Sequence, residues 1–260
     1  MPFDPTPVTD WIQPRLDSGQ VIPEVLDSFA DLDEAEAYEV QHTLIQRRIT
    51  GGDRLIGYKA AMTSKAMREM VGLKEPVMGH LLVSGMLEAS QPIAAGNYLK
   101  PTIEPEVAVI LKHDLAGPGI TRPVALAAID GFAAAIEIGD IKTGDNQRSL
   151  QMTLVCNVMN GGQAIGSKLV SPSGIDLRVE GMVVRINGEV RGSATAAEVL
   201  GDPINSVVFI ANKLGELGGY LQAGMLLMTG SIVRGIPVAA GDHVHVAFTR
   251  LGEVSLAFTA

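Results

Sequence analysis

Hydrophobic and polar positions repeat with a helical period in the first part of the chain. Apolar residues recur every three or four positions between residues 37 and 45, which is typical of an amphipathic helix. Asp33 and Glu36 have the spacing of a capping box before this stretch, and Gly51-Gly52 follows it. The pattern predicts a mainly helical segment from residue 1 to about 55.

From about residue 75 the pattern changes to strands separated by glycine turns. Val107, Val109 and Leu111 alternate with Ala108 and Ile110, and valine and isoleucine favour strands, so residues 101–110 predict a strand. The apolar run 132–138 predicts another. Because strands outnumber helices here, we expect an α+β fold with a curled, antiparallel or mixed sheet. Other expected elements are helices over 64–70, 122–128 and 203–217, a hairpin turn at Asn187-Gly188, and strands over 225–229, 243–248 and 254–258.

Three glutamates lie inside these predicted strands. Glu104 and Glu106 are two residues apart, so their side chains share one strand face at a spacing of roughly 6–7 Å. Glu137 lies in an apolar run, where a buried carboxylate needs a partner. Two interpretations remain open at this point. The pair is either a solvated strand face or, with Glu137, a site for a hard divalent ion such as Mg²⁺ or Mn²⁺.

Lys59 lies in the apolar run 55–64, which predicts a further strand. A lysine in such a run either extends its ammonium to solvent or pairs with buried acids. His243 and His245 share a strand face but have no third zinc ligand nearby, so we expect an exposed edge rather than a metal site. Dinucleotide, phosphate-loop and G-x-S-x-G motifs are absent from the sequence.

Composition narrows the class of protein. With 260 residues and 47% apolar residues, the chain can form one large domain or a core with a small appendage. A net charge of −9 argues against nucleic-acid and anionic-membrane partners. The low share of charged residues, 19%, indicates that much of the surface is buried by self-association or covered by loops. The N-terminus lacks the features of a signal peptide, so we expect a soluble, cytoplasmic protein. The one cysteine, Cys156, is expected to be a buried, inert thiol.

Several short motifs along the chain occur together in one known family, and they extend from residue 33 to the C-terminus. Through them the chain resembles the fumarylacetoacetate hydrolase superfamily, in its branch of 2-hydroxypentadienoate-type hydratases and 4-oxalocrotonate-type decarboxylases. The motifs lie at residues 57–67, 75–82, 103–106, 137–140, 211–214, 221–224, 228–231, 237–242 and 251–255.

This resemblance implies a fold and an assembly. The family fold is a mixed β-roll that follows a small helical or α/β N-terminal part, and it commonly forms a dimer or a larger assembly. We therefore expect an N-terminal part over residues 1–74 and a fumarylacetoacetate hydrolase-like catalytic domain over residues 75–260.

The resemblance also implies an active site with a metal. Glu104, Glu106 and Glu137 would ligate Mg²⁺ or Mn²⁺, and Lys59 would lie over the ion. The substrate would be a small 2-oxo or 2-enol acid that chelates the ion through its carboxylate and 2-oxygen. The residues that would hold this carboxylate are Ser64, Thr229, Gly230 and Ser231.

Some positions depart from the family pattern, which puts ordinary hydration in doubt. The loop after residue 82 lacks the usual acid. His80, beside this loop, is either a substitute base or a structural histidine. Residues that stand where the family has acidic or basic groups are Val83, Ser84, Thr102, Met152 and Cys156.

The expected activity is that of a metal-dependent lyase of hydratase type, acting on a 2-hydroxydienoate or 2-oxo-enoic acid of aromatic hydrocarbon catabolism. Lys59 would serve as proton donor or electrostatic partner. One alternative is a decarboxylase of a 2-oxo-3-enedioate, which needs no activated water. Another is a divergent, non-catalytic protein that binds an oxo acid or acts as the partner subunit of a hydratase–decarboxylase complex.

Overall fold

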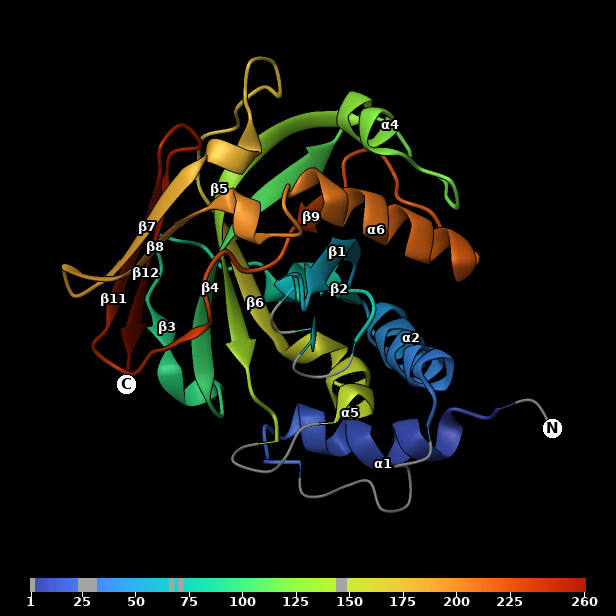
Figure 1. Ribbon diagram of the computed structural model, residues 1–260. Helices are drawn as coiled ribbons and strands as arrows, with labels where there is room; N and C mark the ends of the chain where they lie inside the picture. Colours follow the sequence, from blue (N-terminus) through green and yellow to red (C-terminus); the bar gives the residue numbers. More distant parts are fainter. Residues whose placement is uncertain (1–2, 23–31, 66–67, 70–72, 144–148) are drawn as a thin grey trace.

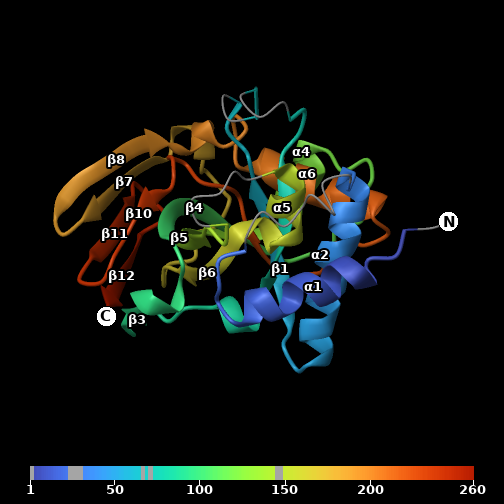
Figure 2. The same ribbon diagram turned by 90° about the horizontal axis from the view of Figure 1, so that it is seen from below.

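Two β-sheets and a group of helices form the protein in the computed structural model. The smaller sheet lies on one side of the molecule and most of the helices lie on the other (Figure 1). The chain termini are at opposite ends in both ribbon views (Figures 1 and 2). The structure describes residues 3–22, 32–65, 68–69, 73–143 and 149–260.

The larger sheet contains the strands in which the three glutamates and Lys59 were predicted. Its strands are β1 (Leu55–Ala61), β2 (Val77–Leu82), β4 (Pro101–Leu111), β5 (Ile129–Asp140), β6 (Asn160–Ile165), β9 (Leu226–Met228) and β10 (Ile236–Pro237). Their order is β2-β1-β9-β4-β5-β6, with β10 beside β4. β1 and β9 are parallel and the other pairs are antiparallel, so the sheet is mixed. Buried apolar residues fill both long strands, β4 and β5.

The smaller sheet packs against β5 through two of its strands, β11 and β12. Its strands are β3 (Ile93–Ala94), β7 (Gly181–Ile186), β8 (Glu189–Thr195), β11 (His243–Phe248) and β12 (Glu253–Thr259), in the order β3-β12-β11-β7-β8. The predicted hairpin joins β7 and β8. Both turn residues, Asn187 and Gly188, have positive φ angles of 55° and 83°, as a two-residue hairpin turn of this type requires.

The helices are α1 (Thr6–Asp17), α2 (Glu34–Thr50), α4 (Arg122–Ala127), α5 (Leu150–Val155) and α6 (Ile204–Glu216). The capping box before α2 is confirmed, because the side chains of Asp33 and Glu36 each accept the other's backbone N–H. The mainly helical segment predicted before residue 55 is confirmed by α1 and α2, and the described residues 18–22 and 51–54 lie outside these helices. The helix expected over 64–70 includes positions 66–67 and 70, which lie outside the described residues.

The α+β class and the mixed sheet are confirmed. β1 belongs by sequence to the predicted N-terminal part, yet it lies inside the larger sheet, between β2 and β9. The domain boundary at residue 74 stays a prediction. Among the helices of the described residues, none has the length and apolar character needed to cross a membrane.

Candidate metal and substrate site

The pairing of β4 with β5 brings the three predicted glutamates together. Glu104 on β4 lies directly opposite Glu137 on β5, and Glu106 is two residues further along β4. One carboxylate oxygen of each residue lies within 4.8 Å of the corresponding oxygens of the other two. Glu106 and Glu137 are fully buried, whereas Glu104 is half-buried. A solvated strand face is therefore not what the structure contains.

Two oxygens of this cluster lack a hydrogen-bond partner within the described part of the chain. They are Oε1 of Glu106 and Oε2 of Glu137, and both are buried. The other oxygen of each is fixed: Gly230 N–H donates to Glu106 Oε2 at 2.8 Å, and Asn160 Nδ2 donates to Glu137 Oε1 at 3.1 Å. Buried carboxylate oxygens without a donor are costly, and three converging carboxylates are the ligands that Mg²⁺ and Mn²⁺ prefer. The donor set fits a hard divalent ion.

Electrostatics support the same conclusion. Burial raises the pKa of Glu106 well above its usual range, and the neighbouring charge of Glu137 raises it further. Lys59 and the hydrogen bond from Gly230 act in the opposite direction but do not cancel these effects. The positive charge that the protein itself places near Glu106 is thus too small to offset the burial of this carboxylate.

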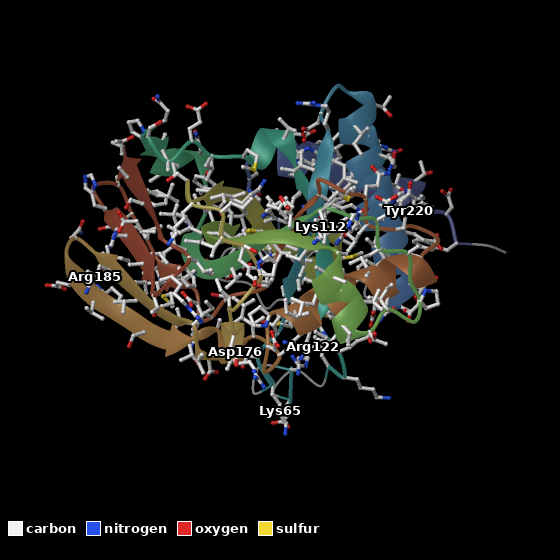
Figure 3. The ribbon with its side chains drawn as sticks, turned by 90° about the horizontal axis from the view of Figure 1, so that it is seen from above. Lys65, Lys112, Arg122, Asp176, Arg185 and Tyr220 are labelled. Carbon is white, nitrogen blue, oxygen red and sulfur yellow. The ribbon has the colours of Figure 1, made fainter. Side chains whose placement is uncertain are left out.

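Lys59 is a buried cation in contact with the cluster. Its side chain is 3% exposed and its ammonium pairs with Glu137 Oε1. A second, longer hydrogen bond of 3.4 Å runs to the backbone oxygen of Val158. Burial alone would lower the pKa of Lys59, but the three carboxylates, Glu137 most strongly, outweigh burial and raise it. Of the two open alternatives, pairing with buried acids is confirmed. The exposed Lys65, in contrast, lies at the periphery (Figure 3).

A cavity of about 840 Å³ opens beside Lys59 and Glu104. Its walls include two of the residues predicted to hold a carboxylate, Ser64 and Ser231. The cavity also has lining residues that the sequence did not indicate, and they lie in the turns after β1, α5 and β9. They include Met62, Thr63, Val158, Met159, Arg234 and Gly235.

The other two predicted carboxylate-binding residues, Thr229 and Gly230, lie behind the cavity wall. The buried hydroxyl of Thr229 donates to the backbone oxygen of Val107 at 2.9 Å. Gly230 has a φ of 107°, and a Cβ there would lie 2.5 Å from Thr63 Oγ1. Only glycine allows this close approach, which brings the Gly230 N–H to Glu106. These two residues therefore contact the cluster and its supporting strand.

His80 lies on the other face of the β1–β2 pair. Lys59 is opposite Gly79, whereas Tyr58 is opposite His80, and the Tyr58 and His80 rings are 5.0 Å apart. Since successive side chains of a strand alternate in direction, His80 points away from Lys59. His80 Nδ1 is 3.0 Å from Gln41 Oε1, and the ring lines a separate cavity of about 390 Å³. This placement argues against His80 as the base of the glutamate site.

The same region contains the neutral residues that replace family acids. Val83 and Ser84 lie in a short turn after β2, and the Ser84 hydroxyl donates to Asp53 Oδ2 at 2.5 Å. Cys156 follows α5, and its thiol lies 3.3 Å from the sulfur of Met152. Burial raises the pKa of Cys156 to about 12, which agrees with the inert thiol expected from its apolar surroundings.

Comparison with known proteins adds independent information. Residues 58–258 match the model of the family described as fumarylacetoacetate (FAA) hydrolase, C-terminal. A 2-hydroxyhexa-2,4-dienoate hydratase of Comamonas testosteroni is 32% identical over 246 residues, which cover 94% of this chain and 93% of that protein. A 4-oxalocrotonate decarboxylase of Pseudomonas sp. (strain CF600) is 32% identical over 237 residues, or 91% of this chain and 90% of the relative.

A solved structure is similar over nearly the whole chain. It is the 4-oxalocrotonate decarboxylase from Pseudomonas putida G7 complexed with magnesium and adipate. The TM-score is 0.94 at 30% sequence identity, and the match covers 98% of this chain and 97% of the other. The relatives of this chain thus include both a hydratase and a decarboxylase at similar identity.

Proposed function

The chain belongs to the fumarylacetoacetate hydrolase family, and on that premise we propose that it is a metal-dependent lyase of hydratase type. Its substrate would be a 2-hydroxydienoate or 2-oxo-enoic acid. The observation that carries this proposal is the three-glutamate cluster with buried Lys59 beside a cavity of about 840 Å³. A cavity of this size accommodates a small organic acid.

Glu104, Glu106 and Glu137 would hold the divalent ion, Mg²⁺ or Mn²⁺. The unpartnered oxygens of Glu106 and Glu137 support this assignment, and so does the similar decarboxylase structure, which is complexed with magnesium. When bound, such an ion stabilises negative charge that develops on the 2-oxygen of an oxo acid. The hydrogen bonds from Gly230 and Asn160 keep the two buried carboxylates in one orientation.

Lys59 would supply the proton in hydration. This reaction adds a proton and a hydroxyl across a carbon–carbon double bond, so an acid must face the substrate. The raised pKa keeps the Lys59 ammonium protonated, and the side chain lines the cavity. Glu137 and the Val158 carbonyl hold the ammonium at the edge of the cluster. Ser64 would donate its hydroxyl hydrogen to the substrate carboxylate, and its position on the cavity wall supports this role. Ser231 would contact the carboxylate from the same cavity, and to donate to it the Ser231 hydroxyl would have to leave the Val233 backbone oxygen, to which it donates at 2.5 Å.

A second candidate function, decarboxylation of a 2-oxo-3-enedioate, is supported by Arg234. This exposed arginine lines the cavity and forms no ion pair or hydrogen bond with another described residue. A guanidinium binds carboxylates in bidentate geometry, and an enedioate has a second carboxylate to offer. Glu198, also on the cavity wall, would oppose such an anion. The adipate bound to the similar decarboxylase is likewise a diacid.

One experiment separates these functions. Metal-loaded protein is incubated with 2-hydroxypenta-2,4-dienoate, its longer homologues and 2-oxohex-3-enedioate, with and without EDTA. Loss of dienol absorbance without CO₂, sensitive to EDTA, is the expected result for the hydratase. Release of CO₂ from the diacid, weakened by Arg234→Gln, would support the decarboxylase. Bound Mn²⁺ without any turnover would favour the third alternative, a non-catalytic oxo-acid-binding or partner subunit.

We further propose that the chain assembles as a homodimer or larger oligomer, and that it can pair with a companion enzyme in a hydratase–decarboxylase complex. The low fraction of charged residues, 19%, supports self-association. Large apolar side chains also reach the surface of the isolated chain, for example Val124, Leu217 and Tyr220. Light scattering at several protein concentrations tests the first part, since a monomer throughout would contradict it.

A further inference from the structure

Three consecutive residues at one wall of the cavity, none of them glycine, have backbone φ angles in the left-handed region. Asn157, Val158 and Met159 have φ angles of 52°, 54° and 57°, and we call them the left-handed turn. L-residues disfavour this region, and a β-branched valine does so most. Such a conformation persists only where its surroundings impose it, and it is concentrated at functional sites.

The side chain of Asn157 supplies the restraint. Its Oδ1 accepts the backbone N–H of His80 at 2.7 Å, and its Nδ2 donates to the backbone oxygen of His80 at 2.9 Å. The amide thus pairs with β2 as a neighbouring strand would. Asparagine is also among the residues that tolerate a positive φ most readily.

The left-handed turn contacts Lys59. The Val158 backbone oxygen accepts from Lys59 Nζ at 3.4 Å, and the side chains of Val158 and Met159 line the cavity. Asn160, the next residue, donates to the same Glu137 oxygen that Lys59 contacts. The turn therefore contacts Lys59 directly, and the residue that follows the turn contacts Glu137.

Gly79 connects Asn157 with Lys59 a second time, because both residues pack against it. It lies opposite Lys59 in the β1–β2 pair. A Cβ on Gly79 would be 3.1 Å from both Asn157 O and Oδ1, and 3.2 Å from Lys59 Cγ. Asn157 and Lys59 therefore pack closely against the same position, where an added side chain would press on both residues.

We propose that Asn157 is a positioning residue that fixes the left-handed turn and thereby places the Lys59 ammonium at the cavity. This inference rests on the proposed function, in which Lys59 delivers the proton. It assigns Asn157 no contact with the substrate. The proposed role also explains why the turn adopts a conformation that its own residues disfavour.

The test is Asn157→Ala, compared with Asn212→Ala. Asn212 makes the same pair of bonds elsewhere in the fold: its Oδ1 accepts from Ile120 N–H at 2.8 Å and its Nδ2 donates to Ile120 O at 3.0 Å. Both variants lose a bidentate amide contact, but only Asn157 is connected to Lys59. We expect kcat to fall roughly 10- to 100-fold in Asn157→Ala. We expect Asn212→Ala to keep wild-type kcat, and Mn²⁺ affinity to be unchanged in both.

A double-mutant cycle with Lys59→Ala separates positioning from general damage. If Asn157 acts through Lys59, adding Asn157→Ala to Lys59→Ala changes kcat by less than about twofold. Losses that multiply instead, or a kcat no lower than that of Asn212→Ala, would overturn the inference. So would a loss of Mn²⁺ affinity, because the residue would then act on the glutamates.

A milder variant covers the case in which Asn157→Ala does not fold. Asn157→Asp retains the acceptor for His80 N–H and loses the donor, so we expect an intermediate kcat. Wild-type kcat in Asn157→Asp, with Asn157→Ala unfolded, would count against the inference. Absence of turnover in the wild-type protein would instead contradict the proposed function, so the two failures are distinguishable.

Discussion

The two faces of the β1–β2 pair each bury one basic side chain, but one of these side chains is charged and the other is neutral. Lys59 is 3% exposed and His80 is 6% exposed. Burial by itself acts to lower the pKa of both side chains. The net pKa of Lys59 is nevertheless raised, whereas that of His80 falls to about 3. Carboxylates surround Lys59, whereas a neutral amide, Gln41, faces the imidazole and His42 lowers its pKa further. The charged partner, more than burial, decides which of the two side chains stays protonated near neutral pH.

Removing one carboxylate breaks this comparison most severely. Glu106→Ala should abolish both Mn²⁺ binding and turnover, because it leaves two glutamates and removes the one fixed by Gly230. Calorimetric titration with Mn²⁺ measures binding, and the substrate panel measures turnover. Glu180→Ala is the matched control, because this buried glutamate pairs with Arg250 outside the cluster. Undiminished Mn²⁺ affinity in Glu106→Ala would refute the site.

Removing the cation from the same face should affect the chemistry more than the metal. We expect Lys59→Ala to lower kcat by about 10²- to 10⁴-fold, the usual contribution of a general acid. Mn²⁺ should bind as tightly as before or more tightly, since a positive charge beside the carboxylates is gone. Steady-state kinetics and Mn²⁺ titration test both parts. Wild-type rates would exclude Lys59 from the mechanism.

The pH dependence of metal binding sharpens the comparison further. The folded-state pKa of Glu106 is raised above its unfolded value, so its contribution to metal-free stability is present at low pH and is lost as pH rises through the folded pKa. Divalent ions require the deprotonated form. The increase in Tm on adding Mg²⁺ or Mn²⁺ should therefore grow from about pH 5 to about pH 8. A thermal-shift series measures it, and a constant increase would contradict the raised pKa.

The smallest effect on activity is expected on the opposite face. His80→Phe should change kcat by less than a general base would require, which is about 100-fold or more. It should lower the free energy of unfolding by about 1–3 kcal/mol, because Gln41 Oε1 loses a buried partner. Urea unfolding and kinetics measure the two quantities. A general-base-sized loss of kcat in a folded variant would restore His80 as a base.

The sequence predicted the strands that carry the glutamates, but not how these strands pair with one another. The alternation in residues 101–110 and the apolar run 132–138 predicted the two long strands, and both are present as β4 and β5. That Glu104 lies opposite Glu137 depends on strand register, which no local pattern specifies. The sequence also could not show on which side of the sheet His80 lies, because this follows from the pairing of β1 with β2.

The left-handed turn shows the other limit of sequence reasoning. Val158 disfavours the conformation it adopts, so local propensity predicts against it. The tertiary bonds of Asn157 to His80, 77 positions away in the chain, override that preference. The signal that could have indicated the turn was the Asn157 side chain itself, since asparagine often occupies positive-φ positions.

The register of β4 against β5 has a consequence for how this protein can change. The three glutamates are part of a hydrogen-bonded ladder whose central strands have neighbours on both sides, so an insertion there would turn every following side chain to the wrong face. The cavity walls at residues 62–64 and 231–235 belong to connecting segments, where substitutions leave the ladder intact. Directed evolution toward new oxo acids should therefore succeed by varying these walls, while the carboxylates are inherited unchanged.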